Sequence, residues 1–386
     1  MARLDEIFDL QMGKTPSRNN ADYWIDGQYD WVSIADLGTY QKYVDETKEK
    51  ISALAVQESG IKSVPANTVI MSFKLSLGKT AITQEPIYTN EAIMAFIPTR
   101  KYEVLPDYFY HLFSAKDWTK GTNRAVMGTT LNKATLGSFS ITVPSLTEQR
   151  KIAAVLDKVS GLIAKRRQQL EKLDEMVKAR FVEMFGDCKR NPKNWSVCNL
   201  EEISQVGSSK RVFVEELKES GIPFFRGTEV GALAEGKKIE PELFITEEHY
   251  QQLCLATGKP QIGDLLMPSI CPDGRIWVVN LEDPFYFKDG RVLWVHDINK
   301  NFNSVFLLHT LKDRIMTDYS SVASGTTFAE LKIFSLKQCK IFNVPIELQN
   351  QFASFVEQTE KTKTAISCSL DKLEILKKAL MQKYFG

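Results

Sequence analysis

The chain repeats itself at a spacing of 200 residues, and this repeat limits what it can fold into. Residues 170–186 read LEKLDEMVKARFVEMFG and residues 370–386 read LDKLEILKKALMQKYFG, with seven of the seventeen positions identical. The match extends backwards, because GTTLNKATLGSFSITVPSLTEQRKIAAVLD (128–157) aligns with GTTFAELKIFSLKQCKIFNVPIELQNQFASFVE (325–357). Such a long period indicates a duplicated domain, since solenoid units span about 20–50 residues.

Shorter matches place the same plan in both halves of the 386-residue chain. They pair RLDEIFDLQMG (3–13) with NLEEISQVG (199–207), VPANTVIMS (64–72) with PQIGDLLMPS (260–269), and LPDYFYHLFSA (105–115) with NSVFLLHTLKD (303–313). We therefore expect two copies of one unit, each a mixed α/β lobe followed by a long helix. The predicted domains are the lobes 1–145 and 189–343 and the helices 146–188 and 344–386.

Both helical segments carry apolar residues at steps of three, four or seven, which is the pattern of a coiled-coil seam. Because one apolar stripe needs a partner, we expect the helices to pair antiparallel and to separate the lobes. The alternative, that each helix packs on its own lobe, stays open. The predicted fold class is α+β, with two mixed α/β domains, a pair of long antiparallel coiled-coil helices and an internal pseudo-twofold repeat. The seam residues are Leu156, Val159, Ile163, Leu170, Leu173, Val177, Met184, Val356, Ile366, Leu370, Leu373 and Leu380.

The sequence argues against several other classes of protein. The opening MARLDEIFDLQ has acids where a signal peptide has basic residues, and no apolar run is long enough to span a membrane. The six cysteines form no CxxC pair, which indicates reduced thiols in a cytoplasmic protein. Two GKT triplets lack the glycine of a phosphate-binding loop, because Phe8 and Phe73 stand at its position. The histidines show no metal-ligand spacing, and the sequence has neither a G-x-S-x-G motif nor a convincing pair of acids, so we expect no metal site and no catalysis in this chain.

The charge is balanced in both lobes. Residues 1–148 carry 15 Lys and Arg against 17 Asp and Glu, and residues 187–345 carry 19 against 21. Neither segment is basic, so the charge alone does not indicate a partner such as nucleic acid.

The string MGKTPSRNNADYWIDGQYDWVSIADL (12–37) resembles the opening of a target-recognition domain. Together with GTT…VPSLTEQRKIAAVLD and the repeated helix, it makes nearly the whole chain similar to the specificity subunit of type I restriction–modification enzymes. The second copy departs from the family pattern in two places. SSKRVFVEELKESGIPFFRG (208–227) replaces the first motif, and VPIELQNQF (344–352) replaces the usual helix entry.

The resemblance implies that each lobe reads one half of a bipartite target in double-stranded DNA, with the paired helices as a ruler between the halves. It implies two modification subunits that methylate adenine with S-adenosylmethionine, and restriction subunits that use ATP and Mg²⁺. This chain would be a non-catalytic DNA-recognition subunit that holds no cofactor itself. Two other hypotheses stay open: a recognition component of a single-chain-type restriction–methylation system, and a coiled-coil scaffold that does not bind DNA.

The candidate DNA-binding residues follow from base chemistry, because Arg and Lys suit guanine and Asn and Gln suit adenine. Each could instead be an ordinary solvated side chain. Thr129, Thr130, Thr326 and Thr327 recur in both copies, which suits a shared backbone role better than the reading of two different half-sites. In the first lobe the candidates are Lys14, Thr15, Ser17, Arg18, Asn19, Asn20, Lys74, Lys79 and Arg124, and in the second Ser208, Ser209, Lys210, Arg211, Arg226, Arg275 and Arg291.

Overall fold

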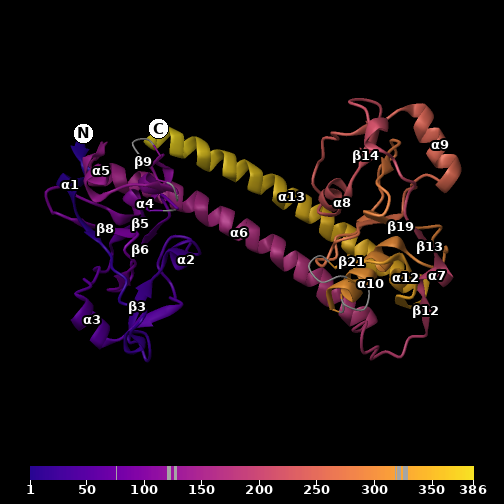
Figure 1. Ribbon diagram of the computed structural model, residues 1–386, viewed down its shortest axis with the longest axis horizontal. Coiled ribbons are helices and arrows are strands. Elements are labelled where there is room, and N and C mark those ends of the chain that lie inside the picture. The colour runs from indigo at the N-terminus through magenta and orange to yellow at the C-terminus, as the bar shows by residue number, and fades with distance from the viewer. Residues whose placement is uncertain (75, 120–122, 126–127, 318, 320–322, 325–328) are drawn as a thin grey trace. The chain divides into compact units, whose positions relative to one another are not determined.

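The structure is a computed structural model that divides into two compact units. Unit 1 comprises Met1–Gln168 with Ser367–Gly386, and unit 2 comprises Gln169–Ile366. Each unit contains one lobe, lobe 1 (1–145) or lobe 2 (189–343), and part of each long helix (Figure 1). The described residues are 1–74, 76–119, 123–125, 128–317, 319, 323–324 and 329–386, with the backbone alone described at 123–125, 128–130 and 324.

Lobe 1 is built around an antiparallel main sheet with the strand order β2-β8-β5-β6. All four residues of β5 are buried, as expected for a short apolar run at the centre of a sheet. Asn67 precedes β5 with a φ of 55° and Gly78 precedes β6 with a φ of 81°, so both strands begin at tight turns. The strands are β2 (Phe8–Met12), β5 (Val69–Ser72), β6 (Thr80–Ile82) and β8 (Ile93–Pro98).

A smaller sheet in lobe 1 has the order β4-β3-β7, and its strands β3 and β7 are parallel. Its strands are β3 (Tyr29–Val32), β4 (Glu49–Ile51) and β7 (Tyr88–Thr89). The other elements are short: β1 (Ala2–Arg3) pairs with β11 (Ser140–Ile141), and β9 (Asn123–Ala125) pairs with β10 (Gly128–Thr130). The helices are α1 (Leu4–Ile7), η1 (Ala21–Tyr23), α2 (Ile34–Leu37), α3 (Ala53–Ser59), α4 (Pro106–Ala115) and α5 (Lys133–Ser138).

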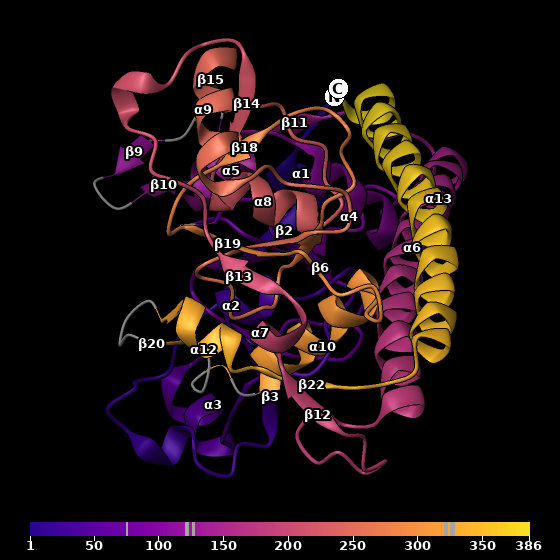
Figure 2. The same ribbon diagram turned by 90° about the vertical axis from the view of Figure 1, so that its right-hand side faces the viewer.

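Lobe 2 repeats both sheets with the same orders and directions. The main sheet runs β13-β19-β16-β17, and the smaller sheet runs β15-β14-β18 with β14 and β18 parallel. Figure 2 shows β14, β15 and β18 close together, and β13 next to β19. The strands are β12 (Val197–Asn199), β13 (Gln205–Gly207), β14 (Ile222–Phe225), β15 (Phe244–Ile245), β16 (Leu265–Pro268), β17 (Trp277–Val278), β18 (Tyr286–Phe287), β19 (Val292–His296), β20 (Ala323–Ser324), β21 (Glu330–Leu331) and β22 (Lys340–Phe342). The helices are α7 (Leu200–Ile203), η2 (Val214–Glu216), α8 (Gly227–Ala234), α9 (Glu247–Thr257), α10 (Ser304–Thr317) and α12 (Ile333–Lys337).

Each strand of the two sheets in lobe 1 therefore has a counterpart in lobe 2. The segments matched in the sequence also correspond, because α4 follows β8 as α10 follows β19, and both are apolar helices. The shared topology confirms the predicted internal repeat and the mixed α/β character of both lobes.

Two helices of 40 residues follow the lobes, α6 (Leu146–Phe185) and α13 (Ile346–Phe385). The long helices of the predicted fold class are thus confirmed. Gly186, with a φ of 87°, follows the last residue of α6. A residue in the left-handed conformation cannot continue an α-helix, and glycine adopts this conformation without steric cost. Gly186 after Phe185 therefore ends α6.

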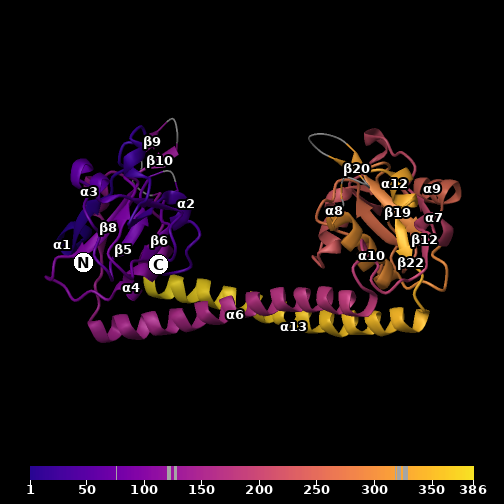
Figure 3. The same cartoon turned by 90° about the horizontal axis from the view of Figure 1, so that it is seen from below.

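The two helices run antiparallel within each unit. In unit 1, the guanidinium of Arg167 on α6 lies 2.7 Å from the carboxylate of Glu374 on α13. In unit 2, Lys363 on α13 lies 2.8 Å from Asp174 on α6, and Phe185 at the end of α6 meets Phe352 near the start of α13. Figure 3 shows the two ribbons side by side within each unit.

The predicted seam residues are all buried or half-buried. However, several of them pack on a lobe as well as facing the other helix. Leu156 belongs to the core cluster of lobe 1, and Leu380 packs against that cluster. Val177 and Val356 belong to the core of lobe 2, and Met184 packs against it. At its two ends the apolar stripe therefore also closes the lobes.

Gln149 joins the start of α6 to lobe 1. Its side chain is fully buried, and its amide nitrogen donates to the backbone oxygens of Glu103 (2.8 Å) and Pro144 (2.9 Å). Its amide oxygen accepts from the backbone nitrogen of Leu105 at 2.9 Å. A single side chain thus satisfies three backbone groups that would otherwise be buried without partners.

Gln349 does the same for α13 and lobe 2. Its amide nitrogen donates to the backbone oxygens of Val344 (2.7 Å) and Asn301 (3.1 Å). Its oxygen accepts from the backbone nitrogen of Asn303 at 2.8 Å. The equal geometry explains why both copies have glutamine at this position, although the surrounding motif differs.

The far end of each helix packs on the lobe of the other copy. Phe181 and Phe185 of α6 are buried in lobe 2, where Phe185 meets Phe306 of α10 at 4.8 Å between ring centres. In unit 1, Phe385 of α13 meets Tyr108 of α4 at 5.5 Å. The repeated phrase at 170–186 and 370–386 is therefore the segment with which one copy docks on the other.

Candidate nucleic-acid interface

The candidate residues of lobe 1 gather at one end of the main sheet. Because neighbouring strands are antiparallel, the end of β2, the start of β8, the end of β5 and the start of β6 lie at the same edge. Backbone hydrogen bonds join the loops there, from Lys14 to Thr89 (2.8 Å) and from Phe73 to Ala92 (3.0 Å). We call the loop residues 13–20, 73–74, 76–79 and 89–92 edge 1.

Two candidates of edge 1 are held by other side chains or by backbone. The Lys14 ammonium donates to the backbone oxygen of Ser59. The Thr15 hydroxyl donates to Glu91 and accepts from the side-chain amide of Asn90 at 3.0 Å. These contacts order the loop. They use the Thr15 hydroxyl within the lobe, whereas the exposed Lys14 ammonium has three donors and the bond to Ser59 uses one of them.

Arg18 is locked between an acid and an aromatic ring. Both of its terminal nitrogens donate to the carboxylate of Glu49, one of them at 2.8 Å. The guanidinium carbon lies 3.7 Å from the centre of the Trp24 ring, and Trp24 meets the buried Trp31 edge-to-face at 5.1 Å. A bidentate carboxylate occupies the donor fork that would read guanine, so Arg18 must leave Glu49 before it can contact a base.

The remaining candidates of edge 1 are more accessible. Asn19 is exposed, and Asn20 caps η1 by accepting from the backbone of Asp22 at 3.2 Å. Ser17 is exposed, and its backbone oxygen accepts from the indole of Trp24.

Two lysines of edge 1 also remain available. Lys79 is exposed, and Lys74 is half-buried with its ammonium 5.2 Å from the Phe73 ring. Within the described part of the chain, neither lysine has an ion pair. Asn19 and these two lysines are therefore the side chains of edge 1 best placed to meet a ligand.

The candidates of lobe 2 gather at the equivalent edge of its main sheet. Ser208 to Arg211 follow β13, Arg291 precedes β19 and Arg275 precedes β17. Arg226 precedes α8, whose first residue Gly227 packs against the backbone of Arg291. We call the loops 208–213, 269–276 and 288–291, together with the start of α8, edge 2.

The two serines of edge 2 have structural partners. The Ser208 hydroxyl donates to the backbone oxygen of Val292 (2.6 Å) and accepts from the backbone nitrogen of Gly290 (2.9 Å). The Ser209 hydroxyl donates to the backbone oxygen of Phe287 at 2.6 Å. These bonds fasten the loop to β18 and β19, and the hydroxyls are thus used within the lobe.

Arg226, Arg275 and Arg291 of edge 2 are paired with acids. Arg226 lies 3.1 Å from Glu242 and also binds Glu229. Burial alone would raise the pKa of Glu229, yet hydrogen bonds from Arg226 and Thr228 hold it at about 2. The charge of this pair is therefore largely compensated inside the lobe.

The other cations of edge 2 differ in how closely they are paired with acids. Arg275 lies 2.8 Å from Asp273, and Arg291 pairs with Glu330. Arg211 is mostly exposed, with its Nε 4.0 Å from Asp289. Lys210 is exposed, and no ion pair is found for it among the described residues. Lys210 and Arg211 are thus the accessible cations of this edge.

Some predicted residues lie outside what the structure describes. The side chains of Arg124, Thr129 and Thr130 are not described, and Thr326 and Thr327 lie outside the described residues. The sequence also missed the acids that hold the arginines. Glu49 lies 31 positions from Arg18, and no local pattern connects the two.

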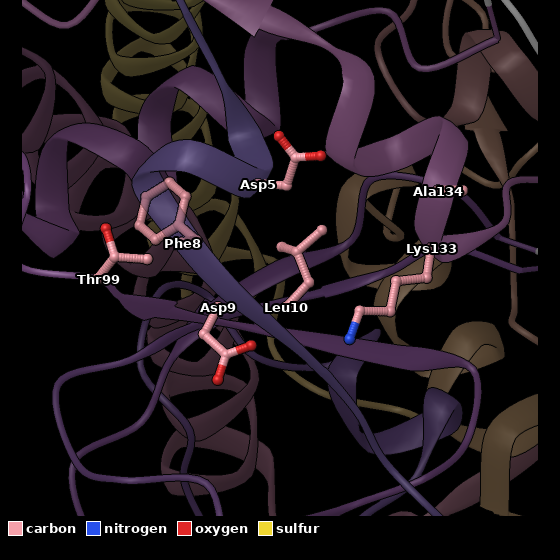
Figure 4. Close-up of a pocket in the computed structure, with 7 residues that line it drawn as sticks. All are labelled: Asp5, Phe8, Asp9, Leu10, Thr99, Lys133 and Ala134. Carbon is pink, nitrogen blue, oxygen red and sulfur yellow. The ribbon is translucent and has the colours of Figure 1, made fainter.

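Lobe 1 also has a hollow of about 590 Å³ along the outer strand β2, at the end of that strand opposite to edge 1. Figure 4 shows the residues that line it. Two carboxylates and one amine face it, and Asp5 is already paired with Arg3 at 2.6 Å. None of the candidate residues contributes to it. The lining residues are Asp5, Phe8, Asp9, Leu10, Thr99, Lys133 and Ala134.

The described residues contain no cluster of His, Cys, Asp and Glu that could hold a metal ion. None of their helices combines the length and the apolarity needed to cross a lipid bilayer.

Comparison with known proteins gives one consistent family. The model of the "Type I restriction modification DNA specificity domain" matches residues 1–173 and 192–374. The MjaIX specificity subunit of a type I restriction enzyme from Methanocaldococcus jannaschii is 27% identical over 92% of this chain and 85% of its own length. The EcoprrI specificity subunit from Escherichia coli is 22% identical over 97% of this chain and 92% of its own.

Solved structures show the same fold. The S subunit of a type I restriction–modification system from M. genitalium superposes with a TM-score of 0.59 at 14% identity, over 100% of this chain and 95% of that one. A chain from a structure on complex assembly and conformational transition of the type I R-M system gives a TM-score of 0.60 at 18% identity. It covers 100% of this chain and 96% of its own.

Proposed function

Because the chain belongs to the family of type I restriction–modification DNA specificity domains, we propose that it selects the DNA target of such a system. In this proposal lobe 1 and lobe 2 each read one half of a bipartite sequence in double-stranded DNA. One observation carries it: both lobes present loops with accessible Lys, Arg or Asn side chains at the equivalent edge of their own main sheets. These side chains are Asn19, Lys74 and Lys79 in lobe 1 and Lys210 and Arg211 in lobe 2.

The charges of the two edges suit specific contacts with bases better than non-specific contacts with DNA phosphates. The arginines Arg18, Arg226, Arg275 and Arg291 have carboxylate partners, and neither lobe segment carries a basic excess. Non-specific affinity for DNA depends on the number of phosphates that free cations neutralise. We therefore expect weak DNA binding by the isolated chain, with partner subunits supplying most of the phosphate contacts.

The helices offer surfaces for these partners. In unit 1, Val155 and Leu162 lie seven residues apart on α6 and are 36% and 39% exposed. Ile375 and Leu376 of α13 are 69% and 45% exposed in the same unit. Exposed apolar residues at heptad spacing suit the packing of another helix. We assign these faces to two modification subunits, and restriction subunits would join the resulting complex.

The chemistry of the system would belong to those partners. In the proposal, the modification subunits bind S-adenosylmethionine and methylate adenine, and the restriction subunits use ATP and Mg²⁺. This chain would bind none of these cofactors and would determine where on the DNA the partners act.

The test is to express the chain with the modification subunit of its own system in cells whose DNA lacks adenine methylation. Sequencing of methylated adenines should reveal one bipartite motif, with a methylated adenine in each half. Cells with the modification subunit alone should lack that motif. Methylation of the same motif without this chain would refute the proposal.

A further inference from the structure

Two adjacent apolar side chains are exposed where the loop 208–213 of edge 2 meets η2. Phe213 is 56% exposed and Val214, the first residue of η2, is 79% exposed. Their neighbour Val212 is 9% exposed and packs in a core cluster with Phe224 and Ile245. The chain thus passes from a buried residue directly to two residues that face outwards.

Contacts on both sides hold this pair in place. The backbone nitrogen of Phe213 donates to the carboxylate of Glu216 at 2.7 Å, which fixes the start of η2. The guanidinium of Arg211 lies 5.6 Å from the centre of the Phe213 ring. Lys210 and Arg211 precede the pair and are exposed, so the apolar side chains stand beside the accessible cations of edge 2.

The internal repeat identifies the counterpart of Phe213 in lobe 1. The turn η1 occupies the place of η2, since each lies between the first strand of the main sheet and the first strand of the smaller sheet. The residue before η1 is Asn20, and the residue before η2 is Phe213. The duplicated edges therefore present an amide in one lobe and a phenyl ring in the other, at the same structural position.

This exchange changes which base the position can contact. The amide of Asn20 is polar, and its oxygen already caps η1, whereas phenylalanine and other apolar groups contact the 5-methyl group of thymine. Edge 2 also has few free cations, because Arg226, Arg275 and Arg291 are paired with acids. Much of its contact with DNA must then come from uncharged groups.

We propose that Phe213 and Val214 pack against the 5-methyl group of a thymine in the half-site that lobe 2 reads. This inference rests on the proposed function. It names the chemistry of one contact, and it assigns to lobe 2 a thymine-reading position where lobe 1 has Asn20.

The experiment uses the complex of this chain with its modification subunits and duplexes that contain its methylated motif. Each thymine of the lobe 2 half-site is replaced in turn by deoxyuridine, which removes only the methyl group. In the complex with the unaltered chain, deoxyuridine at one of these positions should weaken DNA binding about fourfold, which is the effect of losing one buried methyl group. Phe213→Ala should weaken binding to the thymine duplex about tenfold, and deoxyuridine at that position should then cost nothing further.

Two controls make the result specific. Phe334→Ala removes another exposed phenylalanine of lobe 2, on α12, and should leave DNA binding unchanged. Deoxyuridine in the half-site of lobe 1 should affect Phe213→Ala and the unaltered complex equally. Thermal unfolding of both variants verifies that they fold.

Several outcomes would overturn the inference. These are a lobe 2 half-site without thymine, an equal response of both complexes at every deoxyuridine position, and loss of assembly with the modification subunit in Phe213→Ala. The last outcome would identify the pair as a protein contact. Failure of the proposed function would be visible in the methylation experiment, because the complex with the unaltered chain would then methylate no bipartite motif.

Discussion

At the residue scale, neighbouring acids limit how readily the arginines of both edges can contact DNA. Glu49 holds both terminal nitrogens of Arg18 while Trp24 covers one face of the guanidinium. A carboxylate in this position competes with guanine and phosphate for the same donors. The free energy needed to separate the pair therefore sets how readily Arg18 can contact DNA.

Glu49→Gln should release Arg18 from this competition. We expect the assembled complex to bind its target roughly threefold more tightly at about 0.1 M salt, and the slope of log affinity against log salt to steepen by about one. Glu58→Gln is the matched control, because it removes the same charge from lobe 1 but its carboxylate binds Tyr23 instead. Equal effects of the two substitutions would show that Arg18 does not contact DNA.

A second residue-scale prediction concerns pH. His309 packs between Phe181 (6.2 Å between ring centres) and Phe352 (5.1 Å), and burial together with nearby Lys312 and Lys363 lowers its pKa to about 4. The unfolded chain has a histidine pKa near 6.5, so between these values it binds the proton more readily than the folded chain. The contribution of the neutral ring is therefore complete above about pH 6.5 and is lost as the pH falls toward 4.

The free energy of unfolding should accordingly fall by about 1–2 kcal/mol between pH 7 and pH 5 because of this residue. His309→Phe, which keeps an aromatic ring in the cluster, should reduce the pH dependence by that amount. Urea unfolding at the two pH values measures it. An identical pH dependence in the variant would contradict the role of His309.

At the element scale, each helix is fixed at its start by a buried glutamine and at its far end by aromatic packing. Gln149→Leu should leave the backbone groups of Leu105, Glu103 and Pro144 without partners and should lower the unfolding free energy by about 2–4 kcal/mol. Gln168→Ala, an exposed change on the same helix, should cost less than about 0.5 kcal/mol. Chemical denaturation compares the two, and similar values would mean that the buried glutamine does not hold α6 to lobe 1.

The elements also differ in how far the sequence predicted them. The helices were predictable, because periodic residues such as Leu156 and Ile163 and the stop at Gly186 are local signals. The sheet orders were not, since strands such as β18 and β21 have two residues each and pair across long stretches of chain. The candidate loops were predicted from their polarity. Their acids, such as Glu49 for Arg18, depend on tertiary packing, and Phe213 was missed because an apolar residue in a loop normally indicates burial.

At the scale of the whole molecule, duplication explains why one chain has two edges with different chemistry. The two lobes share sheet order, helix entry and helix docking, whereas the loops at edges 1 and 2 differ in length and in residue type. The scaffold can thus stay constant while each edge changes independently. This account predicts that one lobe can be exchanged without altering what the other lobe reads.

Exchange of one lobe tests whether each edge reads its own half-site. Residues 1–145 are replaced by the first lobe of another family member that supplies the contacts to Gln149 and an aromatic partner for Phe385. The chimera is then expressed with the modification subunit, and methylated adenines are sequenced. The account predicts a new sequence in one half of the motif, with the other half unchanged. A change in both halves, or in neither half while methylation remains active, would contradict the assignment of one edge to each half-site.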